Sequence, residues 1–228
     1  MPIQPRALFI TGTDTGVGKT WVAASLVRSL RAAGHDAVGF KPVLCGPDRD
    51  DAEALLAASL SGEKPAAGLT LDTVNPVWLP HPVAPLAAPL LGDDRPVDLC
   101  AILDTWELLA RRHECVIIEG AGGWEVPLDA DRTFATLAGD FAAPVLVVAA
   151  NRLGVLNHTK LTVDAIVRAG LPCAGIVLNE TAPPDPDDPA RRTNLAVLRQ
   201  LFPSLSVTPL GLNEPASADL CPAIGSRR

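Results

Sequence analysis

The 228-residue sequence has no tyrosine, only one methionine, and aromatic residues that make up just 4% of the chain. Long apolar segments are also missing. The most apolar run, residues 142–150, is about half of the roughly 18 residues that a membrane-spanning helix needs. Residues 1–12 contain too few apolar side chains for the core of a secretory signal. These absences predict a cytoplasmic protein that does not contact membranes.

Cysteine and clustered positive charge are also scarce. The five cysteines are an odd number, lie far apart, and show no CxxC or Cys/His spacing, which predicts reduced thiols and no zinc site. The formal net charge is −7 and the pI is about 5.0, with no basic cluster beyond isolated arginine pairs. This balance argues against nucleic acid as a partner and favours a small-molecule substrate.

Short runs rich in Val, Ile and Leu alternate with stretches of helical periodicity. Strands are predicted at 7–11, 37–41, 115–119, 145–149, 173–179 and 206–210, and helices at 20–33, 51–60, 98–112, 157–169 and 190–202. Asp98 is a predicted N-cap, and Gly34 and Gly170 are predicted to follow helix ends. Prolines within 76–96 and 172–189 predict surface loops. The alternation predicts one α/β domain over 1–228, a doubly wound, mostly parallel sheet flanked by helices, with a core at about 7–211 and a partly ordered tail at 212–228.

A glycine-rich segment, GTDTGVGKT at residues 12–20, leads from the first predicted strand directly into the first predicted helix. This context is typical of a P-loop, in which glycines let backbone N–H groups surround phosphate oxygens at the positive end of a helix. Lys19 is expected to bridge the β and γ phosphates of a nucleoside triphosphate, and Thr20 to bind Mg²⁺. The loop is a variant, because the standard pattern has glycine where Thr13 stands. The alternative is a glycine-rich turn with a surface lysine.

Three charged residues are candidates to act beside this loop. Glu119 ends a predicted strand before Gly-Ala-Gly-Gly, so we expect a metal ligand at the carboxyl edge of the sheet rather than a solvated strand end. Lys41 ends another apolar strand, where a cation is costly unless it faces an anion such as a phosphate or substrate oxygen. Asp51 opens a predicted helix, and the residues alone leave it equally open as a first-turn acid.

Several segments, in order and with compatible spacing from about residue 7 to residue 202, resemble dethiobiotin synthetases. They are GTDTGVGKT at 12–20, GFKP at 39–42, TVNP at 73–76, EGAGGW at 119–124, RLGVLNH at 152–158 and AGIVLNE at 174–180. The resemblance implies a P-loop ligase of biotin biosynthesis that uses ATP and Mg²⁺. Such an enzyme joins CO₂ to 7,8-diaminopelargonic acid and closes the ring through a carbamate and a carbamic-phosphoric anhydride, giving dethiobiotin, ADP and phosphate.

The resemblance also implies roles for residues of this sequence. The catalytic residues would be Lys41, Lys19 and Thr15, and the Mg²⁺ ligands would be Thr20, Asp51 and Glu119. The nucleotide would be bound by Gly16, Val17, Gly18, Lys19, Thr20, Trp21, Asp51, Glu119, Gly120, Ala121, Gly122, Asn179 and Glu180. The substrate would contact Thr15, Lys41, Cys45, Gly122, Leu153, Gly154, Leu156, Asn157 and Arg191. Because the loop at 153–157 reaches across a subunit interface in the family, a homodimer is implied.

Two features depart from the family pattern. Cys45 stands where a substrate-contacting serine is usual, and no tyrosine is present to supply a hydroxyl near the substrate carboxylate. Arg191 is our candidate to replace it, by pairing with that carboxylate. The alternative for the whole chain is a ParA- or MinD-like, or regulatory, ATP-binding module without metabolite turnover. The first of these normally carries a signature lysine in its loop, which residues 13–16 lack, so a ligase remains the leading prediction.

Overall fold

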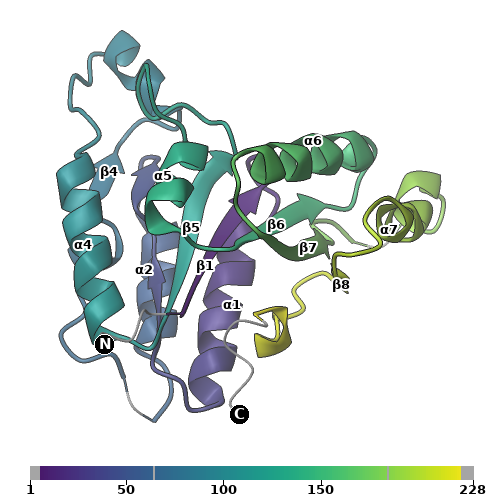
Figure 1. The fold of residues 1–228 in the computed structure, drawn as a ribbon, viewed down its shortest axis with the longest axis horizontal. Helices are drawn as coiled ribbons and strands as arrows, with labels where there is room; N and C mark the ends of the chain where they lie inside the picture. The colour runs from purple at the N-terminus through teal and green to yellow at the C-terminus, as the bar shows by residue number, and fades with distance from the viewer. Residues whose placement is uncertain (1–5, 64, 184, 222–228) are drawn as a thin grey trace.

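A parallel sheet forms the centre of the computed structural model, which describes residues 6–63, 65–183 and 185–221 (Figure 1). The six strands of this sheet, in spatial order, are β2 (Ala37–Phe40), β5 (Cys115–Gly123), β1 (Arg6–Gly12), β6 (Val145–Ala150), β7 (Cys173–Asn179) and β8 (Val207–Leu210). All neighbouring strands run parallel. Helices cover both faces, so the predicted doubly wound α/β fold is confirmed.

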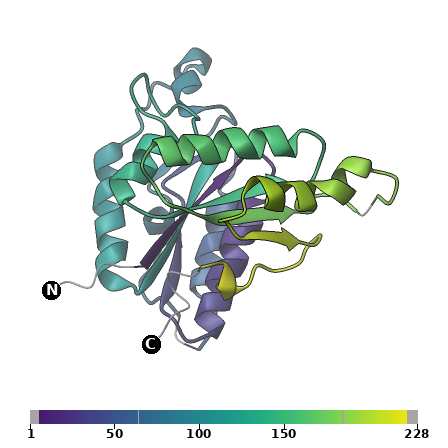
Figure 2. The ribbon, with the colours of Figure 1, turned by 45° about the vertical axis from the view of Figure 1, so that its right-hand side comes forward.

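The helices divide between the two faces of the sheet, as Figures 1 and 2 show. One face packs against α1 (Lys19–Ala32) and α2 (Asp50–Ser59). The other packs against α4 (Leu99–Arg112), α5 (Phe134–Phe141), α6 (Val155–Arg168) and α7 (Pro189–Leu201). Because successive strand residues point to opposite faces, β1 contributes Leu8 and Ile10 to the first core and Phe9 to the second. Within the described residues, no helix has the length and apolar character needed to cross a membrane.

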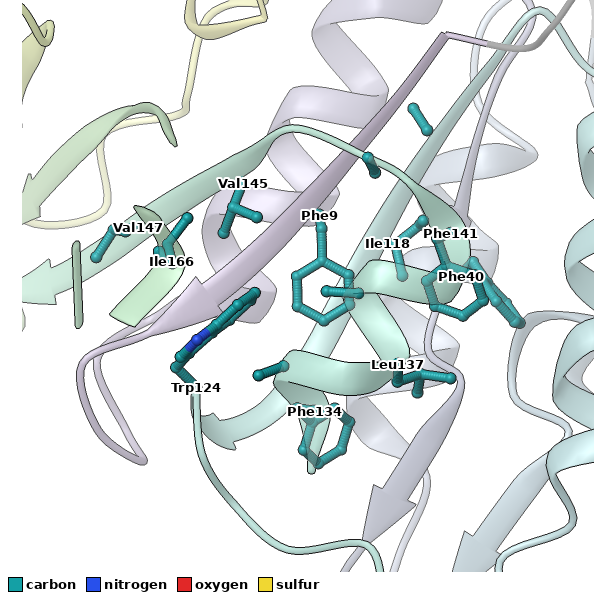
Figure 3. Close-up of a cluster of buried hydrophobic side chains, with 14 of the residues drawn as sticks. Phe9, Phe40, Ile118, Trp124, Phe134, Leu137, Phe141, Val145, Val147 and Ile166 are labelled. Atoms are coloured by element: carbon teal, nitrogen blue, oxygen red, sulfur yellow. The ribbon is translucent and has the colours of Figure 1, made fainter. Parts of the chain in front are cut away.

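Phenylalanine and tryptophan side chains pack against one another in the core between the sheet and the helices α4 to α7 (Figure 3). Phe9 of β1 meets Trp124 edge-on with ring centroids 6.1 Å apart, and it also contacts Phe141 of α5 at 6.4 Å. Phe141 in turn contacts Phe40 of β2 at 6.0 Å and Trp106 of α4 at 5.2 Å. Burial of a phenyl side chain contributes about 1.5–3 kcal/mol, so this cluster fixes α5 and the loop after β5 firmly on the sheet.

Each strand and helix predicted from the sequence is present, and the largest boundary difference is at β5, which continues to Gly123. The predicted cap at Asp98 is confirmed, because its carboxylate accepts a hydrogen bond from the Ala101 N–H at 2.9 Å. Gly34 and Gly170 follow α1 and α6 with φ angles of 86° and 75°. The helix α5 was not predicted, although Thr133 opens it through a capping box.

The prediction that residues 76–96 form only a surface loop is wrong. They contain β4 (Val77–Leu79), which pairs in parallel with β3 (Val43–Cys45), and the 3₁₀ helix η1 (Pro85–Leu91). The short helix α3 (Leu71–Val74) directly precedes this segment. Proline is compatible with these elements because Pro76 lies just before β4 and Pro85 occupies the first turn of η1. The second proline-rich range, 172–189, likewise encloses β7.

Residues 212–221, expected as the start of a partly ordered tail, lie against α1. The short 3₁₀ helix η2 (Ala218–Leu220) is part of this segment. The backbone N–H groups of Ala216 and Ala218 donate to the hydroxyls of Ser25 and Ser29, each at 2.9 Å. Trp21 donates its indole N–H to the Glu214 carbonyl at 2.7 Å. The rest of the predicted tail, 222–228, lies outside the described residues.

Candidate functional site

The glycine-rich loop lies where β1 ends and α1 begins, at the carboxyl edge of the sheet. Gly16 and Gly18 have φ angles of 74° and 92°, which a residue with a Cβ adopts at a cost, and Gly18 caps α1. A Cβ on Gly18 would also lie 2.2 Å from the Asn179 amide nitrogen. These glycines therefore allow the backbone to turn closely into the helix that supplies a phosphate site.

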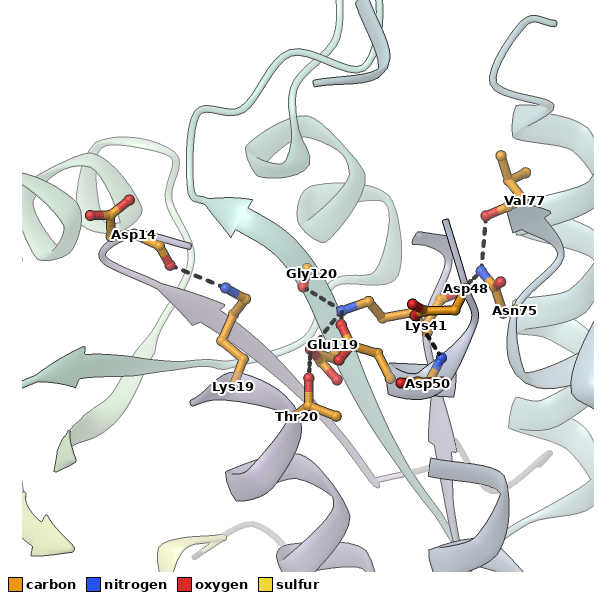
Figure 4. A network of polar contacts seen from close by, with 11 residues as sticks. Asp14, Lys19, Thr20, Lys41, Asp48, Asp50, Asn75, Val77, Glu119 and Gly120 are labelled. Atoms are coloured by element: carbon orange, nitrogen blue, oxygen red, sulfur yellow. Dashed lines mark hydrogen bonds and ion pairs between the residues drawn. The ribbon is translucent and has the colours of Figure 1, made fainter. Parts of the chain in front are cut away.

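Lys19 is not the surface lysine of the alternative interpretation, because its side chain is buried and donates to the Asp14 carbonyl at 3.2 Å (Figure 4). Burial, with a further contribution from the positive charge of Lys41, lowers the pKa of Lys19 to about 8. An anion placed at the loop would reverse part of this effect, since it would favour the charged ammonium. Lys19 is therefore a buried cation beside the loop that is predicted to bind phosphate.

A buried charged cluster lies next to the loop (Figure 4). The Lys41 ammonium is 2.6 Å from a Glu119 carboxylate oxygen and 3.0 Å from the Asp51 carboxylate. Thr20 donates its hydroxyl to the same Glu119 oxygen at 2.8 Å. Glu119 is 0% exposed, so the solvated strand end considered above is excluded. Asp51 lies in the first turn of α2, and its contact with Lys41 shows that it is also more than a first-turn acid.

Lys41 forms ion pairs with two carboxylates, and this arrangement explains the direction in which the pKa of each group is shifted. Burial alone would lower the pKa of Lys41, but Glu119 and Asp51 outweigh it and hold that pKa above its usual value. Burial would raise the pKa of Asp51, but the charge of Lys41 outweighs it and the pKa is lowered. For Glu119, burial dominates, and together with the Asp51 charge it raises the pKa despite Lys41. The cluster is therefore short of positive charge.

The same residues offer the ligands that a hard cation takes. The second oxygen of Glu119 is buried and, within the described part of the chain, has no hydrogen-bond partner. A buried carboxylate oxygen without a partner is costly, and a bound cation would remove that cost. Carboxylate and hydroxyl oxygens are the donors that Mg²⁺ prefers. The donor set of Thr20, Asp51 and Glu119 thus fits a magnesium ion.

The residues predicted on the substrate side border this cluster. Gly122 has a φ of 65°, and a Cβ there would come 3.6 Å from the Thr15 hydroxyl, so the end of β5 and the P-loop are in close proximity. Cys45 lies at the end of β3, and burial raises the pKa of its thiol to about 11, although Lys41 acts to lower it. The Cys45 thiol is therefore neutral at physiological pH and offers a weak hydrogen-bond donor rather than a nucleophile.

The predicted nucleotide-side residues lie around the ends of β7 and α1. Asn179 is buried and donates its amide to the Val17 carbonyl at 2.9 Å, which joins the end of β7 to the P-loop. Trp21 lies on α1 beside Glu214 of the C-terminal segment. Glu180 accepts hydrogen bonds from Arg191 and Asn151, so its carboxylate already has partners within the protein.

Arg191 does not have a free guanidinium available for a substrate carboxylate. It forms an ion pair with Glu180 and donates to the carbonyls of Ala182 and Pro183, the latter at 2.7 Å. Its side chain is largely buried by these contacts. The hypothesis of a direct Arg191–carboxylate pair therefore runs against the structure. The physical reason is the neighbouring Glu180, which already pairs with the Arg191 guanidinium.

The predicted interface loop lies at the start of α6 and is exposed. Leu153 is 85% exposed, and Gly154 caps the helix with a φ of 92°. Leu156 packs partly against the core, whereas Asn157 faces solvent. Arg152, just before this loop, forms an ion pair with Asp14 of the P-loop at 2.7 Å. This ion pair therefore connects a residue next to the predicted interface loop with the predicted phosphate loop.

Sequence reasoning missed a polar network behind this loop. Asn194 of α7 donates to the Asn151 side chain at 2.9 Å and to the Arg152 carbonyl at 3.2 Å, and Asn151 also donates to Glu180. The available signal was the position of Asn151 directly after a buried strand, at the sheet edge where ligands bind. Asn194 gave no signal, because a lone polar residue in an amphipathic helix is ordinary.

Comparisons with known proteins agree with this geometry. A family model described as an AAA domain (AAA_26) matches residues 6–211. The chain is 47% identical over 195 residues to a protein of Akkermansia muciniphila named ATP-dependent dethiobiotin synthetase BioD, covering 86% of this chain and 87% of that protein. It is 49% identical over 199 residues to a protein of the same name from Anaeromyxobacter dehalogenans, covering 86% and 85%. A solved structure of Cyanothece McdA with ATP is similar in fold, with a TM-score of 0.52, 15% identity, and coverage of 99% and 98%.

Proposed function

The chain belongs to the dethiobiotin synthetase family, and we propose that it joins CO₂ to 7,8-diaminopelargonic acid with ATP, giving dethiobiotin, ADP and phosphate. The observation that carries the proposal is the buried cluster of Lys41, Glu119, Asp51 and Thr20 beside the P-loop. A cluster of this kind suits a reaction in which anionic oxygens gather, because its cation and metal ligands are already in position. We expect the enzyme to work in the cytoplasm.

Thr20, Asp51 and Glu119 would hold Mg²⁺, which when bound neutralises charge on the phosphate oxygens of ATP. The unpartnered buried oxygen of Glu119 supports this assignment, as does the deficit of positive charge around the two carboxylates. Lys19 would contact the β and γ phosphates, and the backbone of Gly16, Val17 and Gly18 would surround them. The remaining nucleotide contacts would come from Trp21, Gly120, Ala121, Gly122, Asn179 and Glu180.

In this reaction the protein would act mainly by positioning the reacting groups and by neutralising the negative charge on their oxygen atoms. One substrate amine attacks CO₂ and loses a proton, which forms a carbamate. A carbamate oxygen then attacks the γ-phosphorus and ADP leaves, and the second amine attacks the carbamoyl carbon, expels phosphate and closes the ring. Lys41 would stabilise the negative charge of the carbamate and of the transferred phosphoryl oxygens. Its burial raises the electrostatic effect of its charge, because water screens it little.

We place the diamine end of the substrate against Thr15, Gly122, Cys45 and Lys41. The substrate carboxylate would be held by backbone N–H groups of Leu153, Gly154, Leu156 and Asn157 from a second copy of the chain, in a homodimer. Arg191 would serve by fixing Glu180 and the loop at 182–183.

The decisive assay measures ADP release from purified protein with Mg·ATP and bicarbonate, with and without 7,8-diaminopelargonic acid, and follows dethiobiotin by mass spectrometry. We expect ADP release that depends on the diamine and equals the dethiobiotin formed. Lys19→Met should abolish both, whereas Lys160→Met, at an exposed lysine on α6, should leave both unchanged. ATP hydrolysis without diamine dependence would refute the ligase and favour a ParA- or MinD-like switch.

A further inference from the structure

A second cluster of metal-binding side chains lies at the opposite edge of the sheet from the P-loop. His35 lies two residues before β2, Glu114 directly precedes β5, and Cys115 is the first residue of β5, so all three lie at the amino ends of strands. A ring nitrogen of His35, a carboxylate oxygen of Glu114 and the sulfur of Cys115 lie within 4.8 Å of one another. Two ligands of one zinc ion lie at most about 4.6 Å apart, because each bond is about 2.0–2.3 Å long, so small side-chain rotations would bring all three atoms onto one ion.

The parallel register explains why residues so distant in sequence meet here. Ala37 of β2 pairs with Cys115 of β5. His35 lies two residues before Ala37, and Glu114 lies one residue before Cys115, so this pairing brings both to the same end of the sheet. Gly34, with a φ of 86°, ends α1 just before this point and turns the chain so that His35 enters the sheet edge. Inspection of cysteine and histidine spacing missed the cluster because its members come from two distant segments.

Contacts within and beside the cluster orient its side chains. His35 Nδ1 lies 3.0 Å from a Glu114 oxygen, which orients the ring. Next to the cluster, Arg31 and His113 contact the two oxygens of Asp36, at 3.2 Å and 2.9 Å. A carboxylate, a thiolate and a neutral imidazole would together match the charge of a divalent ion.

We propose that His35, Glu114 and Cys115 form a zinc site. The mixture of nitrogen, oxygen and sulfur ligands is one that Zn²⁺ accepts, whereas Mg²⁺ and Ca²⁺ require oxygen alone. The site is therefore different in kind from the oxygen donors at Glu119. It does not depend on the ligase activity proposed above.

An adjoining cavity, lined by two of the three ligands, would give the ion access from solvent. The cavity measures about 650 Å³ and is lined by Arg31, His35, Asp36, Pro65, His113 and Glu114, among others. Three protein ligands with a fourth position open to solvent are typical of exchangeable or reactive zinc, while closed structural sites use four protein ligands. Water would occupy the fourth position, and a small ligand entering through the cavity could replace it.

Zinc binding should be measured on the full-length chain without a histidine tag, first stripped with a chelator and then saturated with Mg·ADP to block the other site. We expect one zinc ion per chain after gel filtration, measured by mass spectrometry of the metal. Substitution by Co²⁺ should give a thiolate-to-metal absorption band. His35→Ala and Glu114→Gln should each weaken binding at least about tenfold, since even residues that only orient zinc ligands have effects of this size.

Matched cysteine variants identify the sulfur. Cys115→Ala should remove the cobalt thiolate band, whereas Cys100→Ser, at an exposed cysteine on α4, and Cys45→Ser should retain it. If Cys115→Ala fails to fold, His35→Ala and Glu114→Gln still test the proposed site, because these two residues lie at the end of the sheet and outside the buried core. No retained zinc in the wild type, or binding that these two variants leave unchanged, would overturn the proposal. So would a thiolate band that disappears with Cys45.

Discussion

Replacement of Lys41 by methionine tests the charge balance of the buried cluster. Methionine is close to lysine in length and keeps an unbranched side chain, but it removes the charge together with the hydrogen bonds of the ammonium group. In the wild type the ammonium lies 2.6 Å from Glu119 and 3.0 Å from Asp51, and both Lys41 and Glu119 are almost completely buried. Without this cation the two carboxylates face each other, and Glu119 loses its ion pair, although the charge of Lys19 still acts on it.

The expected cost can be estimated from the contacts that remain. Removal of one member of a buried ion pair typically costs about 3–5 kcal/mol. Thr20 still donates to Glu119, and Asp51 can turn toward solvent because its side chain is 47% exposed. We therefore expect a loss near the lower limit, about 3 kcal/mol at about pH 8. Turnover should fall by roughly 10²–10³, as when one preorganised charge-stabilising group is lost.

The stability loss should depend on pH, with a definite sign. Burial already raises the pKa of Glu119, and loss of Lys41 removes the main group that opposes this. A carboxyl whose folded pKa exceeds its unfolded pKa stabilises the fold at pH values below the unfolded pKa, and this stability is lost as pH rises through the folded pKa. Lys41→Met should therefore be less destabilised at about pH 5 than at about pH 8.

Urea unfolding at both pH values measures this effect, with Lys160→Met as the lysine control. The free energy of unfolding and the m-value are obtained together, so a change in the compactness of the denatured state would be recognised. A loss below about 1 kcal/mol, or an equal loss at the two pH values, would refute the inference that Lys41 compensates a buried carboxylate.

Three further predictions concern the P-loop and a helix end. ATP affinity should be constant at low pH and fall as pH rises above the Lys19 pKa of about 8, and titration calorimetry should find no such fall in Lys19→Met. Gly18→Ala should abolish ATP binding, because its φ is 92° and the new Cβ would meet Asn179, whereas Gly34→Ala, with a φ of 86° and open space, should cost only about 1–2 kcal/mol of stability and retain binding. Equal ATP affinity in both variants would contradict this. Asp98→Ala should lower the urea unfolding free energy by about 1 kcal/mol without changing turnover, and an unchanged midpoint would show that the cap contributes nothing.

The alternation of apolar runs and helical periods was enough to predict the parallel sheet and its main helices. Buried parallel strands are apolar at nearly every position, as in VLVVAA of β6, and such runs are easily recognised. The helix α5 was missed because FATLAGDF has only eight residues, about two helical turns, which is too short for a helical period to be recognised. The pair β3 and β4 was missed because three-residue strands carry almost no pattern.

The residues of the candidate site that belong to sequence motifs could be predicted, whereas the contacts between them could not. Lys19 and Thr20 follow from the P-loop, and Glu119 and Lys41 from charges placed at the ends of apolar strands. The contact of Lys41 with both carboxylates was not predictable, because it depends on the distances between β2, β5 and α2. The pairing of Arg191 with Glu180 was missed for the same reason: two charges 11 positions apart give no sign that they meet across a loop.

The strand order has a consequence for synthesis of the protein on the ribosome. β1 emerges first, yet in the sheet it lies between β5 and β6, and its first residue, Arg6, pairs with Cys115. Until those later strands are made, β1 has no partner on either edge and offers unpaired backbone groups for aggregation. Pairing over such separations slows folding, so the nascent chain should depend on chaperones for longer than a protein with local contacts. The Glu214 contact to Trp21 forms later still, which makes the nucleotide site one of the last parts to be completed.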